Sequence, residues 1–93
     1  MDTQTNRKMA GGKALLELAG KRTVVGAKQL RKALNAGEVC KEFLAVNADP
    51  AITEPLEALC QLKSVDYAWV RSMTDLGHAC GIEVGAAAAA ALD

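Results

Sequence analysis

The residues in this sequence best suited to binding chemistry are basic and amide side chains that follow a glycine. Gly26 is followed by Lys28 and Gln29, and Arg31 and Lys32 come within one further helical turn. Lysine and glutamine can hydrogen-bond base edges, while the two later cations can neutralise phosphates. A helix beginning here would also direct free backbone N–H groups towards an anion. The segment predicts a nucleic-acid or anion site, although an ordinary solvated helix face would have the same pattern.

Charge is unevenly distributed, although eleven basic and eleven acidic residues balance in total. Residues 1–32 hold eight basic and two acidic side chains, a net charge of +6, and residues 33–93 carry −6. Between Lys21 and Lys32 there are five cations and no acid. Such a cluster is a candidate nucleic-acid footprint, but a total charge of zero predicts weak non-specific binding.

A second candidate surface is the segment bounded by Gly81 and Gly85. Within it the β-branched residues Ile82 and Val84 flank Glu83. Two such side chains in a loop either complete the hydrophobic core or offer an apolar surface to an unstacked base. The residues alone leave both interpretations open.

Other chemistries lack the residues that they need. Cys40, Cys60 and Cys80 show no CxxC or Cys/His zinc spacing, so neither a disulfide framework nor a zinc site is expected. His78 precedes Cys80 by two residues without a visible third residue to orient it, which leaves a thiol enzyme as a remote alternative. Gly11–Lys13 is not a P-loop because the upstream glycine is missing. We therefore expect no enzyme activity, no metal and no other cofactor.

Helices and strands alternate along the chain, and they must position these residues. The order α-β-α-β-α-β-α predicts an α/β domain with helices on both faces of one sheet. The final run Ala86–Ala91 has the propensity of a helix but also the size of a central strand, and local sequence does not decide. The other expected elements are a helix over Lys13–Ala19, a strand over Thr23–Val25, a helix over Ala27–Ala36, a strand over Phe43–Val46, a helix capped by Thr53, a strand over Val65–Val70 and a helix capped by Ser72.

Length and composition limit the chain to one small domain, because 93 residues with 51% hydrophobic content bury only a modest core. We expect a flexible segment over residues 1–12 and a single domain over residues 13–93. The longest uncharged apolar stretch, Val84–Leu92, is far shorter than the roughly 20 residues of a membrane helix. The N-terminal residues contain no apolar region of a secretory signal. These features predict a cytoplasmic protein without a membrane partner, and we expect it to be a monomer.

Three ordered segments resemble the ribosomal protein L7Ae family, whose members bind kink-turn RNA. They are GAKQLRKAL from Gly26, AVNADP from Ala45 and LGHACGIEVGAAAAAAL from Leu76. The resemblance extends from about Lys13 to Leu92 and is strongest to the short bacterial members. It implies a three-layer α/β/α sandwich with a four-stranded mixed sheet, in which the alanine run forms the last strand.

The resemblance also implies a site and a ligand. Kink-turns are sharply bent duplexes with a three-nucleotide bulge beside tandem G·A pairs, found in ribosomal RNA and riboswitch-like RNA. By the resemblance, Gly26 lets the backbone approach the RNA, and Lys28 and Gln29 read the guanines of the G·A pairs. The loop Ile82–Val84 matches the loop that packs against the bulge. The expected RNA-binding residues are Gly26, Lys28, Gln29, Arg31, Lys32, Ile82, Glu83 and Val84.

The sequence departs from the family pattern at several of these positions. Lys28 and Gln29 stand where archaeal and eukaryotic members usually have Asn and Glu, and an uncharged Gln accepts hydrogen bonds more weakly than Glu. Met73 and His78 stand where many members carry Lys. Two phosphate contacts are therefore expected to be absent or pH-dependent.

A protein-interaction adaptor on the same fold is the main alternative to RNA binding. It would use the acidic part of the chain from Ala33 onward as its binding face. It predicts that basic substitutions at Glu38, Glu42 or Glu54 alter function and that substitution of Lys28 does not.

Overall fold

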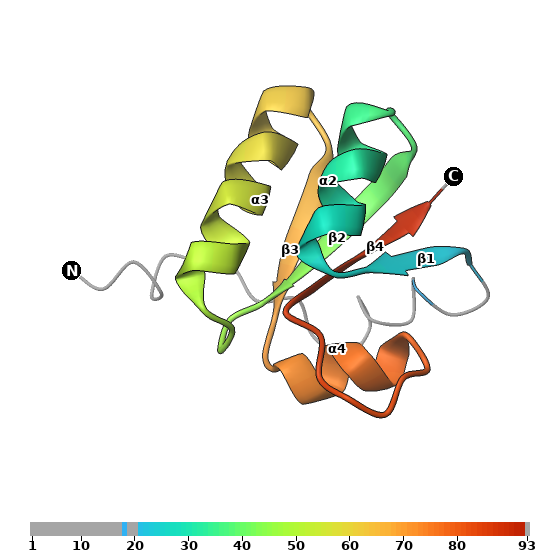
Figure 1. Ribbon diagram of the computed structural model, residues 1–93, viewed down its shortest axis with the longest axis vertical. Helices are drawn as coiled ribbons and strands as arrows, with labels where there is room; N and C mark the ends of the chain where they lie inside the picture. The colour runs from blue at the N-terminus through green and yellow to red at the C-terminus, as the bar shows by residue number, and fades with distance from the viewer. Residues whose placement is uncertain (1–17, 19–20, 93) are drawn as a thin grey trace.

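The computed structural model describes Leu18 and residues 21–92 of the chain. These residues form a four-stranded mixed sheet of order β1-β4-β2-β3 with helices on both faces (Figure 1), so the expected α/β/α sandwich is confirmed. The elements are β1 (Thr23–Val25), α2 (Ala27–Asn35), β2 (Val39–Ala45), α3 (Pro50–Lys63), β3 (Asp66–Val70), α4 (Met73–Ala79) and β4 (Ala88–Leu92). The expected segment 1–12 and helix Lys13–Ala19 lie outside the described residues, except for Leu18, which is buried in a 3₁₀ turn.

Strand direction brings three helix starts to one edge of the sheet. β4 is antiparallel to β1 and β2, and β3 is parallel to β2, so β1, β2 and β3 end where β4 begins. The backbone N–H of Gly26 donates to the Ala88 carbonyl at 3.3 Å, and that of Ala45 donates to Ala87 at 2.9 Å. We call this end of the sheet the carboxyl edge. It comprises residues 26–29, 47–51, 71–73 and 82–87.

The hydrophobic core has two halves, one on each face of the sheet (Figure 1). On the first face, α2 and α3 lie side by side and pack Leu30 and Leu56 against Leu44 of β2. On the second face, α4 packs Leu76 against Phe43. The alternation of Phe43 and Leu44 across β2 follows the two-residue period of a strand and serves both halves.

The alanine run forms a central strand, as the family resemblance implied. β4 lies between β1 and β2, and each residue from Ala88 to Ala91 is at most 1% exposed. Small side chains on both faces allow the helices to approach the sheet closely. Burial and strand pairing therefore outweigh the high helix propensity of alanine.

Two element starts differ from the sequence-based expectation. The third helix begins at Pro50, and its N-cap is Asp49, whose carboxylate accepts from the Ala51 N–H at 2.9 Å. The expectation of Thr53 as the cap was wrong, because Thr53 lies one turn inside the helix and is buried. The second strand begins at Val39, four residues before the expected start at Phe43.

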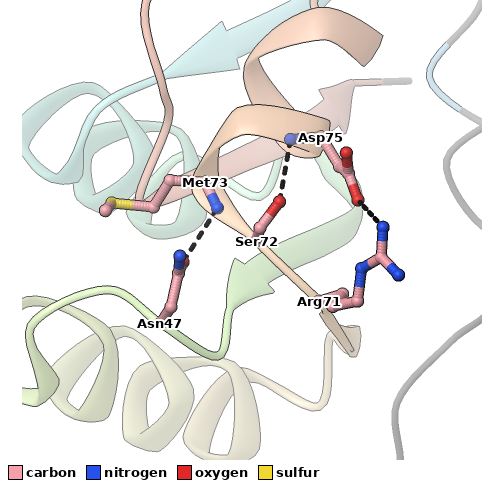
Figure 2. Close-up of polar contacts among 5 residues, drawn as sticks. All are labelled: Asn47, Arg71, Ser72, Met73 and Asp75. Atoms are coloured by element: carbon pink, nitrogen blue, oxygen red, sulfur yellow. Dashed lines mark hydrogen bonds and ion pairs between the residues drawn. The ribbon is translucent and has the colours of Figure 1, made fainter.

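The fourth helix begins as expected at a serine cap. The Ser72 hydroxyl accepts from the Asp75 N–H at 3.1 Å (Figure 2). The Asp75 carboxylate turns away from the cap and pairs with Arg71 at 3.4 Å, so only half of a capping box forms. Within the described ranges, none of the helices has the length and apolar character needed to cross a membrane.

Candidate nucleic-acid interface

Gly26 joins β1 to α2 in a backbone conformation that favours glycine. Its φ of 100° and ψ of 142° lie in a region that side chains rarely adopt. Its N–H donates to the Ala88 carbonyl of β4. Its carbonyl accepts the Leu30 N–H at 2.9 Å, which is the first hydrogen bond of the helix. Since Gly26 has no side chain with which to cap α2, the first N–H groups of the helix face outward without a side-chain acceptor from their own cap.

The polar residues expected to bind RNA lie on the outer face of α2. Leu30, Ala33 and Leu34 are buried against the sheet, whereas the four polar residues are exposed. Those four are Lys28, Gln29, Arg31 and Lys32. Residues three and four positions apart are neighbours on a helix surface, so the three cations share one face and Gln29 borders it.

The five cations between Lys21 and Lys32 do not form one footprint. Lys21 and Arg22 precede β1 and line a pocket with Cys40 and Leu92, at the opposite end of the sheet from Gly26. The chain needs about 13 Å to pass from residue 22 to residue 26 as a strand. Of the five cations, Lys28 therefore lies in the carboxyl edge, and Arg31 and Lys32 follow it on α2.

The loop before β4 divides its two β-branched residues between core and solvent. Ile82 is half-buried and packs against the core beneath α4, whereas Val84 is 70% exposed and Glu83 is exposed. The two interpretations left open by the sequence therefore apply to different residues. Ile82 packs in the protein, and Val84 presents an apolar surface outward.

Two glycines allow this loop to lie directly on α4. A Cβ at Gly77 would collide with the carbonyl oxygen of Val84, and one at Gly85 would lie 3.1 Å from the Met73 Cβ. The Ile82 N–H donates to Gly77 and the Ala86 N–H donates to Met73, each at 3.0 Å. Sequence reasoning missed Gly77, since a glycine inside a short helix gives no sign of the segment that will pack on it.

The carboxyl edge brings the start of α2 and the loop before β4 together. The Gly26 N–H is hydrogen-bonded to the Ala88 carbonyl, and residues 82–87 connect the end of α4 to the start of β4 beside it (Figure 1). Asn47 completes the edge, because its Oδ1 accepts from the Met73 N–H at 2.9 Å (Figure 2). Asn47 was not expected as a site residue, and only the tertiary contact between segments 26 residues apart reveals its position.

A catalytic or metal site is not supported by the described part of the chain. Burial raises the pKa of the Cys80 thiol, which is the opposite of the activation that a nucleophile requires, and His78 is exposed. Among the described residues, no group of three or more His, Cys, Asp or Glu side chains could hold a metal ion.

The acidic surface expected for an adaptor is smaller than its sequence suggested. Glu38 and Glu54 are exposed, but Glu42 is completely buried beneath α3. The expectation that Glu42 could contact a partner was therefore wrong. It lies on the inner face of β2 between the Ala90 and Tyr67 positions of the adjoining strands.

Known proteins resemble this chain in sequence and in structure. Residues 11–93 match the family described as ribosomal protein L7Ae/L30e/S12e/Gadd45. An RNA-binding protein of Bacillus pumilus is 51% identical over 67 residues, which cover 72% of this chain and 82% of the relative. RNA-binding protein YbxF of Geobacillus stearothermophilus is 45% identical over 74 residues, which cover 80% of this chain and 89% of that protein.

Two solved structures share the arrangement of elements. The Giardia lamblia 15.5kD RNA binding protein superposes with a TM-score of 0.74 at 29% identity, covering 88% of this chain and 68% of that chain. A protein with unknown function from Bacillus halodurans C gives a TM-score of 0.76 at 22% identity, covering 90% and 86% of the two chains. The second likeness concerns the fold alone.

Proposed function

The chain belongs to the ribosomal protein L7Ae/L30e/S12e/Gadd45 family, and on that premise we propose that it binds structured RNA and stabilises kink-turns. The matched relatives are named RNA-binding proteins, and they share most of their length with this chain. The observation that carries the proposal is the start of α2, where Gly26 turns the chain at φ 100° and exposes Lys28 and Gln29 beside the loop before β4.

The start of α2 and the loop before β4 have separate roles in this proposal. Lys28 and Gln29 contact guanines of the tandem G·A pairs, while Arg31 and Lys32 neutralise phosphates. The glycine at position 26 keeps side-chain bulk away from the approaching backbone of the RNA. Across the start of β4, the exposed Val84 provides an apolar surface for an unstacked bulge nucleotide.

Recognition of this kind acts on the shape of the RNA. A kink-turn exchanges between an extended and a bent form, and a protein that binds only the bent form shifts the population towards it. The protein then needs neither a cofactor nor a catalytic group. We propose that it acts as a non-enzymatic cytoplasmic monomer on ribosomal or riboswitch-like RNA.

A titration against two RNAs tests the proposal. One RNA is a kink-turn duplex, and the other has both G·A pairs replaced by Watson–Crick pairs. We expect at least tenfold tighter binding to the kink-turn. Three to five ion contacts would give a log–log salt slope of about −2 to −4. Lys63→Ala is the matched control for substitutions of the α2 cations, because Lys63 is also an exposed cation but lies at the far end of α3. Equal binding to both RNAs would contradict the proposal and direct attention to a protein partner of Glu38 and Glu54.

A further inference from the structure

Asn47 lies in a turn whose backbone is fixed on both sides. The preceding residue, Val46, donates its N–H to the Val70 carbonyl at 2.9 Å, which continues the pairing of β2 with β3. The following residue, Ala48, donates to the Ala45 carbonyl at 3.1 Å, and its side chain is buried in the core. The Asn47 side chain itself is exposed. Its position is therefore set by the sheet, although its side chain faces solvent.

The orientation of the Asn47 amide is also fixed. Its Oδ1 accepts the Met73 N–H at 2.9 Å (Figure 2). A backbone N–H can only donate, so it must meet the amide oxygen and not the amide nitrogen. Oδ1 is consequently occupied, and the Nδ2 group with its two donors is directed away from Met73. No acceptor for Nδ2 is present among the residues that the structure describes.

The backbone of Met73 connects Asn47 to the loop before β4. Its N–H binds Asn47, and its carbonyl accepts the Ala86 N–H at 3.0 Å. Gly85 packs against the Met73 side chain. Asn47 and the loop carrying Val84 are therefore both hydrogen-bonded to the backbone of Met73. Across the sheet, β4 separates the end of β2 from the end of β1, so Asn47 and Gly26 lie on opposite sides of the start of β4.

We propose that Asn47 is a specificity-determining residue whose Nδ2 group donates a hydrogen bond to an acceptor oxygen or nitrogen of the nucleotide that packs on the loop before β4. This inference rests on the proposed function. The donor is uncharged and already oriented, so its hydrogen bond adds recognition of one nucleotide without adding non-specific attraction to phosphates. RNA acceptors of this kind are the 2′-hydroxyl and the base edges of unstacked nucleotides.

Asn47→Asp separates this role from a purely structural one. Aspartate keeps the acceptor for the Met73 N–H at the start of α4, where a negative charge is favourable, so we expect the melting temperature to stay equal or to rise. It lacks the Nδ2 donor, so we expect kink-turn affinity to fall about tenfold, the effect of one lost hydrogen bond that leaves an acceptor unpaired. A merely structural Asn47 would lose affinity only through the added negative charge, an effect that salt screens.

The added negative charge of Asn47→Asp needs its own control. Thr74→Asp places a carboxylate on the neighbouring exposed turn of α4 and removes no proposed donor. Salt screens the repulsion that this charge exerts on RNA. At high salt we expect Thr74→Asp to bind like the wild type, whereas Asn47→Asp remains about tenfold weaker. Equal affinities for the two variants at high salt would overturn the inference.

Substitutions in the RNA identify the contact directly. Each nucleotide of the bulge is replaced in turn by its 2′-deoxy or its abasic form. We expect one replacement to weaken wild-type binding and to have no further effect on Asn47→Asp, because both changes remove the same hydrogen bond. Fully additive effects at every nucleotide would overturn the inference while leaving kink-turn binding intact. Absence of any kink-turn preference in the wild type would instead overturn the proposed function, and this inference with it.

Discussion

Glu42 is expected to lower the stability of this protein as the pH rises. Its side chain is completely buried, and neither carboxylate oxygen has a hydrogen-bond partner of ordinary geometry among the described residues. Burial raises its pKa from 4.5 to about 7, and interaction with the Cys60 thiol opposes that rise in part. Glu57 of α3 and Tyr67 of β3 are titratable groups near Cys60.

The sign follows from comparing the folded and unfolded chains. Below pH 4.5 the carboxyl group is protonated in both states and contributes no pH dependence. Between pH 4.5 and about 7 the unfolded chain releases the proton while the folded chain retains it, so stability falls as pH rises. Above about pH 7 the carboxyl group is ionised in both states, and its effect on stability no longer changes with pH. A pKa raised from 4.5 to about 7 corresponds to about 3 kcal/mol of unfolding free energy.

Glu42→Gln isolates this contribution in urea denaturation at pH 4 and pH 8. The amide has similar size but does not titrate, and any penalty for its own burial is the same at both pH values. Relative to the wild type, we expect the variant to gain about 3 kcal/mol of unfolding free energy between pH 4 and pH 8. Glu38→Gln, at an exposed position, should show a change of less than about 0.5 kcal/mol. If the unfolding free energies of the wild type and Glu42→Gln differ by the same amount at pH 4 and pH 8, Glu42 does not titrate with a raised pKa.

Four further substitutions test the proposed interface. In RNA titrations, Gln29→Ala should lower the discrimination between G·A and Watson–Crick RNAs by about 1–3 kcal/mol. Equal losses of affinity for both RNAs would exclude a role of Gln29 in reading guanine. Lys32→Ala should instead lower the affinity for both RNAs alike and reduce the salt slope by about one. Gly26→Ala forces a side chain into φ 100°, so its unfolding free energy should fall by about 1–3 kcal/mol in urea; an unchanged value would show that the turn is not strained. Gly77→Ala should displace Val84 and lower both the melting temperature and kink-turn affinity, and normal affinity would show that the loop does not contact RNA.

The fold could be predicted where the chain carries local signals. The apolar spacing of Leu30 and Leu34 and the serine cap at Ser72 placed α2 and the start of α4 correctly. The alanine strand is different, because alanine favours a helix and only the family resemblance assigned it to the sheet. Its state depends on burial between neighbouring strands, which no local window contains.

The site was predictable only in part for the same reason. Lys28 and Gln29 follow a glycine and could be selected by position. Asn47 could not be selected, because its side chain matters through a hydrogen bond to the distant Met73. Glu42 was expected on the surface because it is charged, yet tertiary packing beneath α3 buries it. Contacts between distant segments decide both cases.

The central claim is that this protein binds the bent form of a kink-turn in preference to the extended form. Resonance energy transfer between dyes at the two ends of a kink-turn RNA measures that preference without reference to any single residue. In the absence of divalent ions, added wild-type protein should convert the RNA from low to high transfer efficiency with saturation. The RNA lacking both G·A pairs should stay extended at the same concentrations. Binding that leaves the kink-turn extended, or bends both RNAs equally, would contradict the account.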